Sequence, residues 1–222
     1  MNVPRLYVIG DSISIQYGPY LQQYLKDAWI YARKEGEHEA LLNLDNPIGA
    51  NGGDSSRVLE FLRGMGGRIE ADVMLINCGL HDIKISNATG RQQVPLEAYG
   101  ANLRAIIALV RNTGIRPVWA RTTPVDDATH NNRPNMDFKR FAADVKSYNA
   151  LADDIMAALD VPPIDLFVFT RNIGVELFCD HVHFRENIRT LQAAYIAGWL
   201  IAYWRSLGNE ALNGGDRPAP RY

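Results

Sequence analysis

The sequence predicts an α/β fold, a three-layer α/β/α sandwich around a mostly parallel sheet of about five strands. Short apolar runs alternate along the chain with longer segments in which apolar residues recur at helical spacing. Such alternation is typical of parallel strands joined by helices that cover both faces of a sheet. A flavodoxin-like strand order is expected, which would place a functional site beyond the carboxyl ends of the strands.

Each predicted element follows from its local pattern. The apolar run Leu6–Ile9, ended by Gly10, predicts the first strand. After Gly18 and Pro19, apolar residues at helical spacing between Tyr20 and Ala28 predict a helix that Gly36 stops. The further predictions are strands at 40–44, 73–77, 118–120 and 161–165, and helices at 55–62, 96–111, 138–159 and 188–207.

The chain is expected to form one domain over residues 1–207, followed by a loose tail at 208–222. Its 222 residues, 47% hydrophobic and 22% charged, have ordinary globular composition for one large domain. The tail is rich in Gly, Pro and charge and lacks apolar periodicity. The sequence contains no internal repeat or composition break that would indicate a second domain.

Charge and patterning also limit the partners. A formal net charge of -2 and a pI near 6.2 leave no cationic excess, so no nucleic acid is expected as a partner. The first apolar run is too short for a signal peptide or a membrane span, which predicts a soluble chain without stable membrane association. The compartment, cytoplasmic or exported after loss of a leader, stays open, and no motif indicates the oligomeric state.

Four polar segments stand where the fold would bring loops together. Three of them, Gly10–Ser14, Asn51–Ser55 and Asn77–Asp82, follow predicted strands, and Asp180–His183 precedes the last predicted helix. Loops that follow parallel strands meet at one edge of the sheet. The sequence therefore predicts a single site built from these four segments.

Three side chains in these segments suit nucleophilic catalysis. A serine hydroxyl becomes a good nucleophile when a histidine removes its proton and a carboxylate orients that histidine. Ser12, His183 and Asp180 can take these parts, and the short spacing of Asp180 and His183 lets one turn present both. Oxyanion donors are expected from the N–H groups of Ser12 and Gly53 and from the side chain of His81.

The four segments, in this order, resemble the signature blocks of the SGNH hydrolase (GDSL-type esterase/lipase) superfamily. Gly10-Asp11-Ser12 resembles its first block, Gly53 its second-block glycine, and Asp180 with His183 its Asp-x-x-His block. The resemblance implies a three-layer α/β/α fold and an ester or thioester substrate, with no cofactor and no metal.

One block departs from the family pattern. Where the family usually has Gly-x-Asn-Asp, this chain has Gly79-Leu80-His81-Asp82, so His81 replaces the oxyanion-hole asparagine. An imidazole still offers an N–H donor. The oxyanion hole is therefore expected to survive, with a changed pH dependence.

One rival site and one rival fold compete with this interpretation. Cys179, His181 and His183 alternate along the chain at a spacing that also suits zinc, and His81 and Asp82 could complete such a site from another loop. The nucleophile elbow of α/β-hydrolases is disfavoured because its second glycine is missing: Ser14 stands there.

Other polar residues have both a functional and a structural interpretation. Asn51, Asp54 and Arg121 are candidates for substrate binding, but glycine-rich turns and structural ion pairs use the same residues. His38 and His130 are expected to face solvent in loops.

The predicted function is a serine-dependent ester hydrolase that acts through an acyl-enzyme on small acyl esters, acetyl esters first, with carbohydrate esters as a first guess by analogy. The alternatives are a thioesterase or lysophospholipase. A non-catalytic anion- or sugar-binding module, or a decayed esterase, is the alternative from another class.

Overall fold

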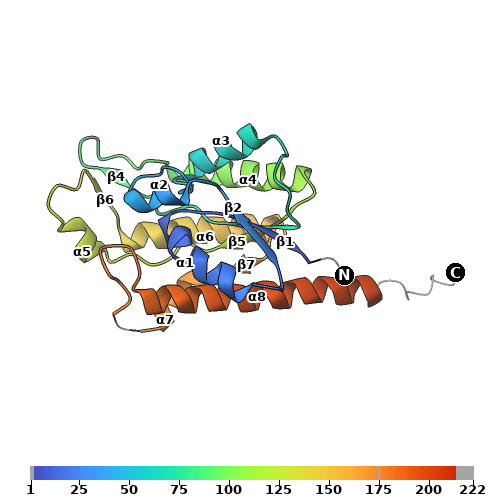
Figure 1. The fold of residues 1–222 in the computed structure, drawn as a ribbon. Helices are drawn as coiled ribbons and strands as arrows, with labels where there is room; N and C mark the ends of the chain where they lie inside the picture. Colours follow the sequence, from blue (N-terminus) through green and yellow to red (C-terminus); the bar gives the residue numbers. More distant parts are fainter. Residues whose placement is uncertain (1–2, 175, 214–222) are drawn as a thin grey trace.

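The sheet is parallel throughout and has a flavodoxin-like order. The computed structural model describes residues 3–174 and 176–213, in which one sheet has the order β2-β1-β3-β5-β7 (Figure 1). Counted within this sheet alone, the order is 2-1-3-4-5, which confirms the predicted fold class. Its strands are β1 (Arg5–Ile9), β2 (Ile30–Arg33), β3 (Val73–Ile76), β5 (Arg116–Ala120) and β7 (Pro163–Ile164).

Helices cover both faces of the sheet and make the predicted three layers. On one face, α1 and α7 pack against α8, and on the other α4 packs against both α3 and α6 (Figure 1). Their bounds are α1 (Ser12–Tyr24), α3 (Ser55–Met65), α4 (Leu96–Asn112), α6 (Ala142–Ala158), α7 (Leu166–Asn172) and α8 (Glu186–Asn213). None of the described helices is both long and apolar enough to cross a bilayer.

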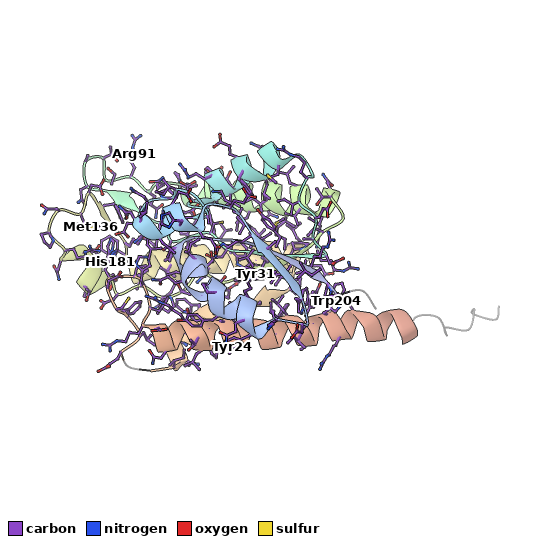
Figure 2. The ribbon with its side chains drawn as sticks, in the orientation of Figure 1. Tyr24, Tyr31, Arg91, Met136, His181 and Trp204 are labelled. Carbon is purple, nitrogen blue, oxygen red and sulfur yellow. The ribbon has the colours of Figure 1, made fainter. Side chains whose placement is uncertain are left out.

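A smaller group of elements lies at the end of the molecule where β1 finishes (Figure 1). It contains α2 (Glu37–Leu42), α5 (Asp127–Asn131), and the short antiparallel pair β4 (Ile85–Ser86) and β6 (Phe138–Lys139). We call β4, β6 and α5 the β4–β6 arm. Figure 2 labels Arg91, Met136 and His181 at this same end.

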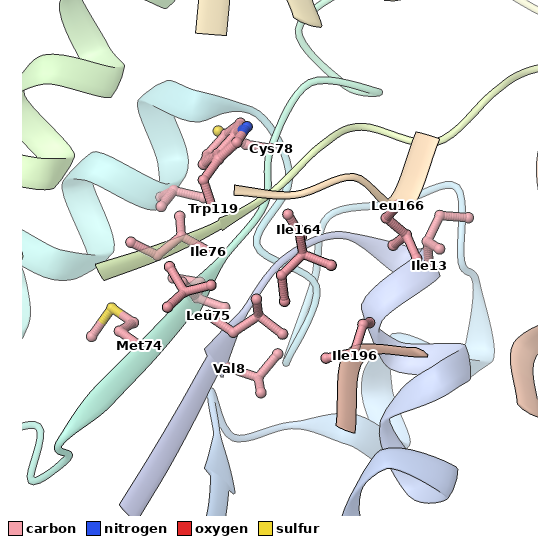
Figure 3. Close-up of a cluster of buried hydrophobic side chains, with 14 of the residues drawn as sticks. Val8, Ile13, Met74, Leu75, Ile76, Cys78, Trp119, Ile164, Leu166 and Ile196 are labelled. Atoms are coloured by element: carbon pink, nitrogen blue, oxygen red, sulfur yellow. The ribbon is translucent and has the colours of Figure 1, made fainter. Parts of the chain in front are cut away.

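The core lies between the sheet and its helices. Val8 of β1 and Leu75 of β3 are fully buried, and Ile13 of α1 and Ile196 of α8 pack on the same cluster (Figure 3). Strands with both faces buried read as continuous apolar runs, which is why β1 and β3 were predictable. This packing makes the carboxyl edge of the sheet a firm support for the loops that follow it.

Two predictions near the start of the chain are wrong. The first helix begins at Ser12, well before Tyr20, because the Asp11 side chain caps it by accepting the Ile13 N–H at 3.0 Å. Ile30–Arg33, predicted as part of that helix, is the edge strand β2 and pairs with β1.

The segment predicted as a strand at 40–44 lies instead in and just after α2. Gly36 at φ +93° lets the chain turn before this helix, and Glu37 and Glu39 stand in its first turn, where acidic residues favour a helix. The loop at Asn51–Ser55 therefore follows a helix and not a strand.

Two helix boundaries also differ from prediction. Helix α6 begins at Ala142, because Phe138 and Lys139 pair with β4. Helix α8 continues past Leu207 to Asn213, so residues 208–213 are not a loose tail. Gly208 costs a helix only about 1 kcal/mol, and Ala211 and Leu212 beyond it are good helix formers. The rest of the predicted tail, 214–222, lies outside the described residues.

Candidate active site

Ser12, His183 and Asp180 form one hydrogen-bonded chain. The Ser12 Oγ lies 2.9 Å from the His183 Nε2, and the His183 Nδ1 lies 2.7 Å from the Asp180 Oδ2. Ser12 and His183 are only 4% and 2% exposed. The structure thus brings Ser12 to the turn that carries Asp180 and His183, although most of the domain separates them in sequence.

The first loop places Ser12 at the start of α1. With Asp11 as the N-cap, Ser12 is the first helical residue, and its N–H has no acceptor within its own helix. The positive end of the helix dipole also lies there, which favours a developing negative charge. Ser12 can therefore offer both its hydroxyl and a backbone donor to one reacting group.

Asp180 is held as a carboxylate by its own turn. Its Oδ1 accepts the N–H groups of Val182 and His183, both at 2.8 Å. Burial would raise the pKa of Asp180, but the hydrogen bonds from the His183 side chain and these two N–H groups hold it well below its usual range. A carboxylate at Oδ2 favours the His183 tautomer with its proton on Nδ1, which leaves Nε2 free to accept the Ser12 proton.

His81 lies in the third loop and is 2% exposed. Burial, with the charges of Lys84 and Arg140 nearby, holds the pKa of His81 well below its usual range. The imidazole is therefore neutral across the neutral pH range and has one N–H to donate. A changed pH dependence, expected from the sequence, is not favoured by this environment.

The loop that carries His81 is fixed from two sides. Gly79 has φ +150°, and a Cβ there would lie 2.3 Å from the Thr122 Oγ1, so only glycine fits. The Arg140 Nε donates to the Leu80 carbonyl at 2.8 Å. Arg140 is itself buried and was not found from the sequence, because nothing in its neighbourhood marks it as different from a surface arginine.

Gly53 needs its glycine for conformational reasons, but its N–H is engaged. Its φ is +71°, and a Cβ would lie 2.7 Å from the Pro47 Cβ. The Gly53 N–H donates to the Asn51 Oδ1 at 3.0 Å. To serve an oxyanion, this N–H would have to share or leave the bond to Asn51.

Asp82 ties the second loop to the third. It is fully buried, and its two carboxylate oxygens lie 2.9 and 3.1 Å from the Ser55 N at the start of α3. Burial raises the pKa of Asp82 to about 7, although the bonds from Ser55 oppose the shift. Between about pH 4 and pH 7, the native protein therefore keeps a proton on Asp82 that the unfolded chain has released.

This raised pKa predicts a pH-dependent effect of Asp82→Asn on stability. Stability from protonated Asp82 is present at low pH and falls as pH rises through that window, whereas asparagine cannot ionise. The stability of the variant relative to wild type should rise by a few kcal/mol, as an order of magnitude, between about pH 4.5 and pH 7.5 in urea unfolding.

Asp126→Asn is a matched control for that measurement. Asp126 caps α5, and its hydrogen bonds from Thr129 lower its pKa, so it is ionised across this pH range and the stability of Asp126→Asn relative to wild type should stay nearly constant. A difference between Asp82→Asn and wild type that is equal at both pH values would contradict a raised pKa of Asp82.

The three candidate substrate-binding residues have partners within the protein. The Asn51 side-chain amide donates to the Leu44 and Asn46 carbonyls, both at 3.2 Å. The Asp54 Oδ1 caps α3, and Arg121 forms ion pairs with Asp153 at 2.9 Å and Asp165 at 2.8 Å. These contacts favour the structural interpretation of Asn51, Asp54 and Arg121.

The ligands of the rival zinc site are not arranged as the sequence suggested. The Cys179 Sγ lies 3.4 Å from the carbonyl oxygens of His183 and Phe184. Among the described residues, the ligand atoms that approach within 4.8 Å of one another belong to Asp180, His181 and His183. Two of these three, Asp180 and His183, already belong to the series of hydrogen bonds that ends at Ser12.

A second buried cluster stands beside the triad. His130, expected to face solvent, is fully buried, and its Nδ1 lies 2.5 Å from the His181 Nδ1. The His181 Nε2 lies 3.4 Å from the Asp45 Oδ1, and this imidazole lowers the pKa of Asp45 to about 2. The ring centroids of His181 and His183 are 6.0 Å apart. Asp45 lies in the loop after α2 and His130 lies in α5, so no sequence motif could have joined them.

A family comparison agrees with this geometry. The model of the GDSL-like lipase/acylhydrolase family matches residues 8–188, which include every member of the triad. The chain belongs to this family. The resemblance seen in the four sequence blocks is thereby confirmed, and the chain is an ester hydrolase of the GDSL type.

Solved structures with the same fold include other GDSL-like enzymes and esterases. The lipase/acylhydrolase from Enterococcus faecalis has a TM-score of 0.67 at 15% identity, with 90% of this chain and 96% of that chain covered. An acetyl xylan esterase has 0.64 at 14%, covering 86% and 97%. A carbohydrate acetylesterase from Sinorhizobium meliloti has 0.63 at 12%, covering 90% and 99%. No curated protein matches this GDSL-like sequence.

Proposed function

We propose that this GDSL-like hydrolase cleaves small acyl esters, acetyl esters first, through an acyl-enzyme formed on Ser12. The observation that carries the proposal is the unbroken chain from the Ser12 hydroxyl through His183 to Asp180, with bonds of 2.9 and 2.7 Å. This chemistry needs a nucleophile and a base within hydrogen-bond reach of each other, and a third group that orients the base.

In the first half of the reaction, the Ser12 Oγ attacks the ester carbonyl carbon while its proton passes to the His183 Nε2. The Ser12 N–H and the neutral His81 imidazole are the proposed donors to the oxyanion of the tetrahedral intermediate. When the intermediate collapses, the bond to the alcohol oxygen breaks and that oxygen takes the proton from His183. Asp180 stabilises the imidazolium that forms between these two transfers.

In the second half, water replaces the alcohol. His183 removes one proton from the water as its oxygen attacks the acyl carbon, and returns that proton to the Ser12 Oγ as the acyl bond breaks. The products are a carboxylic acid and an alcohol, and Ser12 is regenerated. Each step uses residues of this chain alone.

The choice of an acetyl group on a carbohydrate is made by analogy. Two proteins of the same fold are described as an acetyl xylan esterase and a carbohydrate acetylesterase. At 14% and 12% identity, these relatives support the substrate class only as a proposal. Thioesters and lysophospholipids are the alternatives to be tested beside it.

Covalent labelling and a chain-length series test the proposal together. A fluorophosphonate should modify one residue per chain, and peptide mass spectrometry should find the label on Ser12. Among p-nitrophenyl esters, kcat/KM should be highest for acetate and fall toward octanoate. If Ser12 is labelled but kcat/KM is highest for octanoate, the proposed acetyl preference is wrong and the proposed mechanism stands. A protein that shows neither labelling nor turnover would be a binding module and not an esterase.

A further inference from the structure

A polar cavity lies between the β4–β6 arm and the loop after α2. Its volume is about 430 Å³, within the usual range for small-molecule sites. Among its lining residues are Asp45, Lys84, Arg91, Gln93, Asp137 and Phe138. Its walls therefore come from three parts of the chain that are far apart in sequence.

One wall of the cavity leads toward the triad through Asp45 and His181. Asp45 in that wall lies 3.4 Å from His181, and the ring centroids of His181 and His183 are 6.0 Å apart. Lys84 follows the His81 loop, and its backbone N–H donates to the His81 carbonyl at 3.3 Å. Figure 2 shows Arg91, Met136 and His181 at this end of the molecule.

Another cavity, of about 390 Å³, lies far from this chemistry. Its lining includes Met65, Thr113 and Ile115, which stand at the ends of α3 and α4 and before β5. That is the amino edge of the parallel strands, opposite the edge that carries Ser12. The polar cavity is better placed to hold part of the substrate.

The side chains of the polar cavity offer both donors and acceptors. Lys84, Arg91 and Gln93 supply N–H groups, and Asp45 and Asp137 supply carboxylate oxygens. Two cations and two carboxylates balance each other, so a highly charged ligand gains little. An acyl chain in the cavity would leave these polar groups buried without hydrogen bonds, which costs binding free energy. A neutral alcohol with several hydroxyl groups can use donors and acceptors at once.

Lys84 has donors to spare. Its Nζ lies 3.3 Å from the Asp45 carbonyl oxygen and 4.4 Å from the centroid of the Phe138 ring. Within the described residues, no carboxylate oxygen lies within 4.0 Å of it. An ammonium group has three N–H donors, so further hydrogen bonds to a ligand remain available.

We propose that this cavity binds the alcohol part of the ester, that this alcohol is a sugar, and that Lys84 donates to its hydroxyl groups. The inference rests on the proposed function, since it needs an ester at Ser12. It adds the place where the leaving group is held and a residue that selects it.

Two matched esters separate a sugar subsite from general esterase activity. In 6-O-acetylglucose and cyclohexylmethyl acetate, the same acetyl group sits on a ring-bearing methylene, and only the first ring has hydroxyl groups. Release of acetate gives kcat/KM for each, and their ratio is the sugar preference. Wild type should prefer the sugar ester at least about tenfold, as expected from one or more hydrogen bonds to a charged group.

Lys84→Met keeps the length of the stem and its packing on Phe138 but removes the donors. It should lower the sugar preference about tenfold, mainly through KM. Arg91 lines the same cavity but is more exposed than Lys84, so Arg91→Met should lower the sugar preference less. Lys139→Met is the control, because Lys139 lies on β6, is exposed, and does not line the cavity.

The outcomes are distinct. Equal kcat/KM of wild type for the two esters, or an unchanged sugar preference in folded Lys84→Met and Arg91→Met, would overturn the subsite and leave the proposed function standing. Release of acetate from neither ester would overturn the proposed function and the subsite with it. Thermal unfolding of each variant establishes that it is folded before the ratio is interpreted.

Discussion

Replacing Ser12 with alanine should lower the turnover of p-nitrophenyl acetate about a millionfold, the loss that removal of a triad serine causes when base and carboxylate depend on it. The 2.9 Å contact between the Ser12 Oγ and the His183 Nε2 is the reason for expecting a loss of this size. Without the hydroxyl, His183 has no proton to accept from a nucleophile. Steady-state assays at high enzyme concentration should find only the residual rate.

Ser14→Ala is the matched control for that loss. Ser14 lies two residues further along α1, where its Oγ donates to the Asp11 carbonyl at 2.7 Å and accepts from Arg33 at 3.1 Å. Its removal should cost about 1 kcal/mol of stability and leave turnover per folded molecule close to wild type. A Ser12→Ala protein that keeps more than about a hundredth of wild-type turnover would mean that Ser12 is not the nucleophile.

The outer parts of the fold were harder to predict than its centre. Strands β1 and β3 were predictable because burial on both faces demands continuous apolar runs. The edge strand β2 is covered less, and its pattern merged with the helix before it. The arm strands β4 and β6 have two residues each, too few for any periodicity to appear.

The site divides in a similar way. Ser12, Asp180 and His183 stand in short motifs whose chemistry depends on neighbours in sequence: Asp11 caps the helix that Ser12 begins, and one turn presents Asp180 with His183. Asp45, His130 and Arg140 act through tertiary contacts alone. Their positions near the triad follow from how separate segments of the chain meet at the sheet edge, which no local pattern records.

His81→Ala should lower kcat about a hundred- to a thousandfold, because removing one oxyanion donor has that cost. The expectation depends on His81 being the side-chain donor in place of the asparagine usual in this family. The burial of His81, with Lys84 and Arg140 near it, keeps its pKa well below the usual range. The side chain therefore donates one N–H throughout the neutral and mildly alkaline range, and its own titration should add no limb to the pH profile there.

His81→Asn separates the loss of a donor from the loss of packing. An asparagine amide supplies an N–H that does not titrate, so this variant should recover part of the activity that alanine loses and keep the shape of the wild-type kcat profile between about pH 6.5 and pH 9. If His81→Ala keeps kcat within about threefold of wild type, the oxyanion is held by backbone donors alone. The engaged N–H of Gly53 would then have to leave Asn51 during turnover, and Asn51→Ala should raise kcat by freeing it.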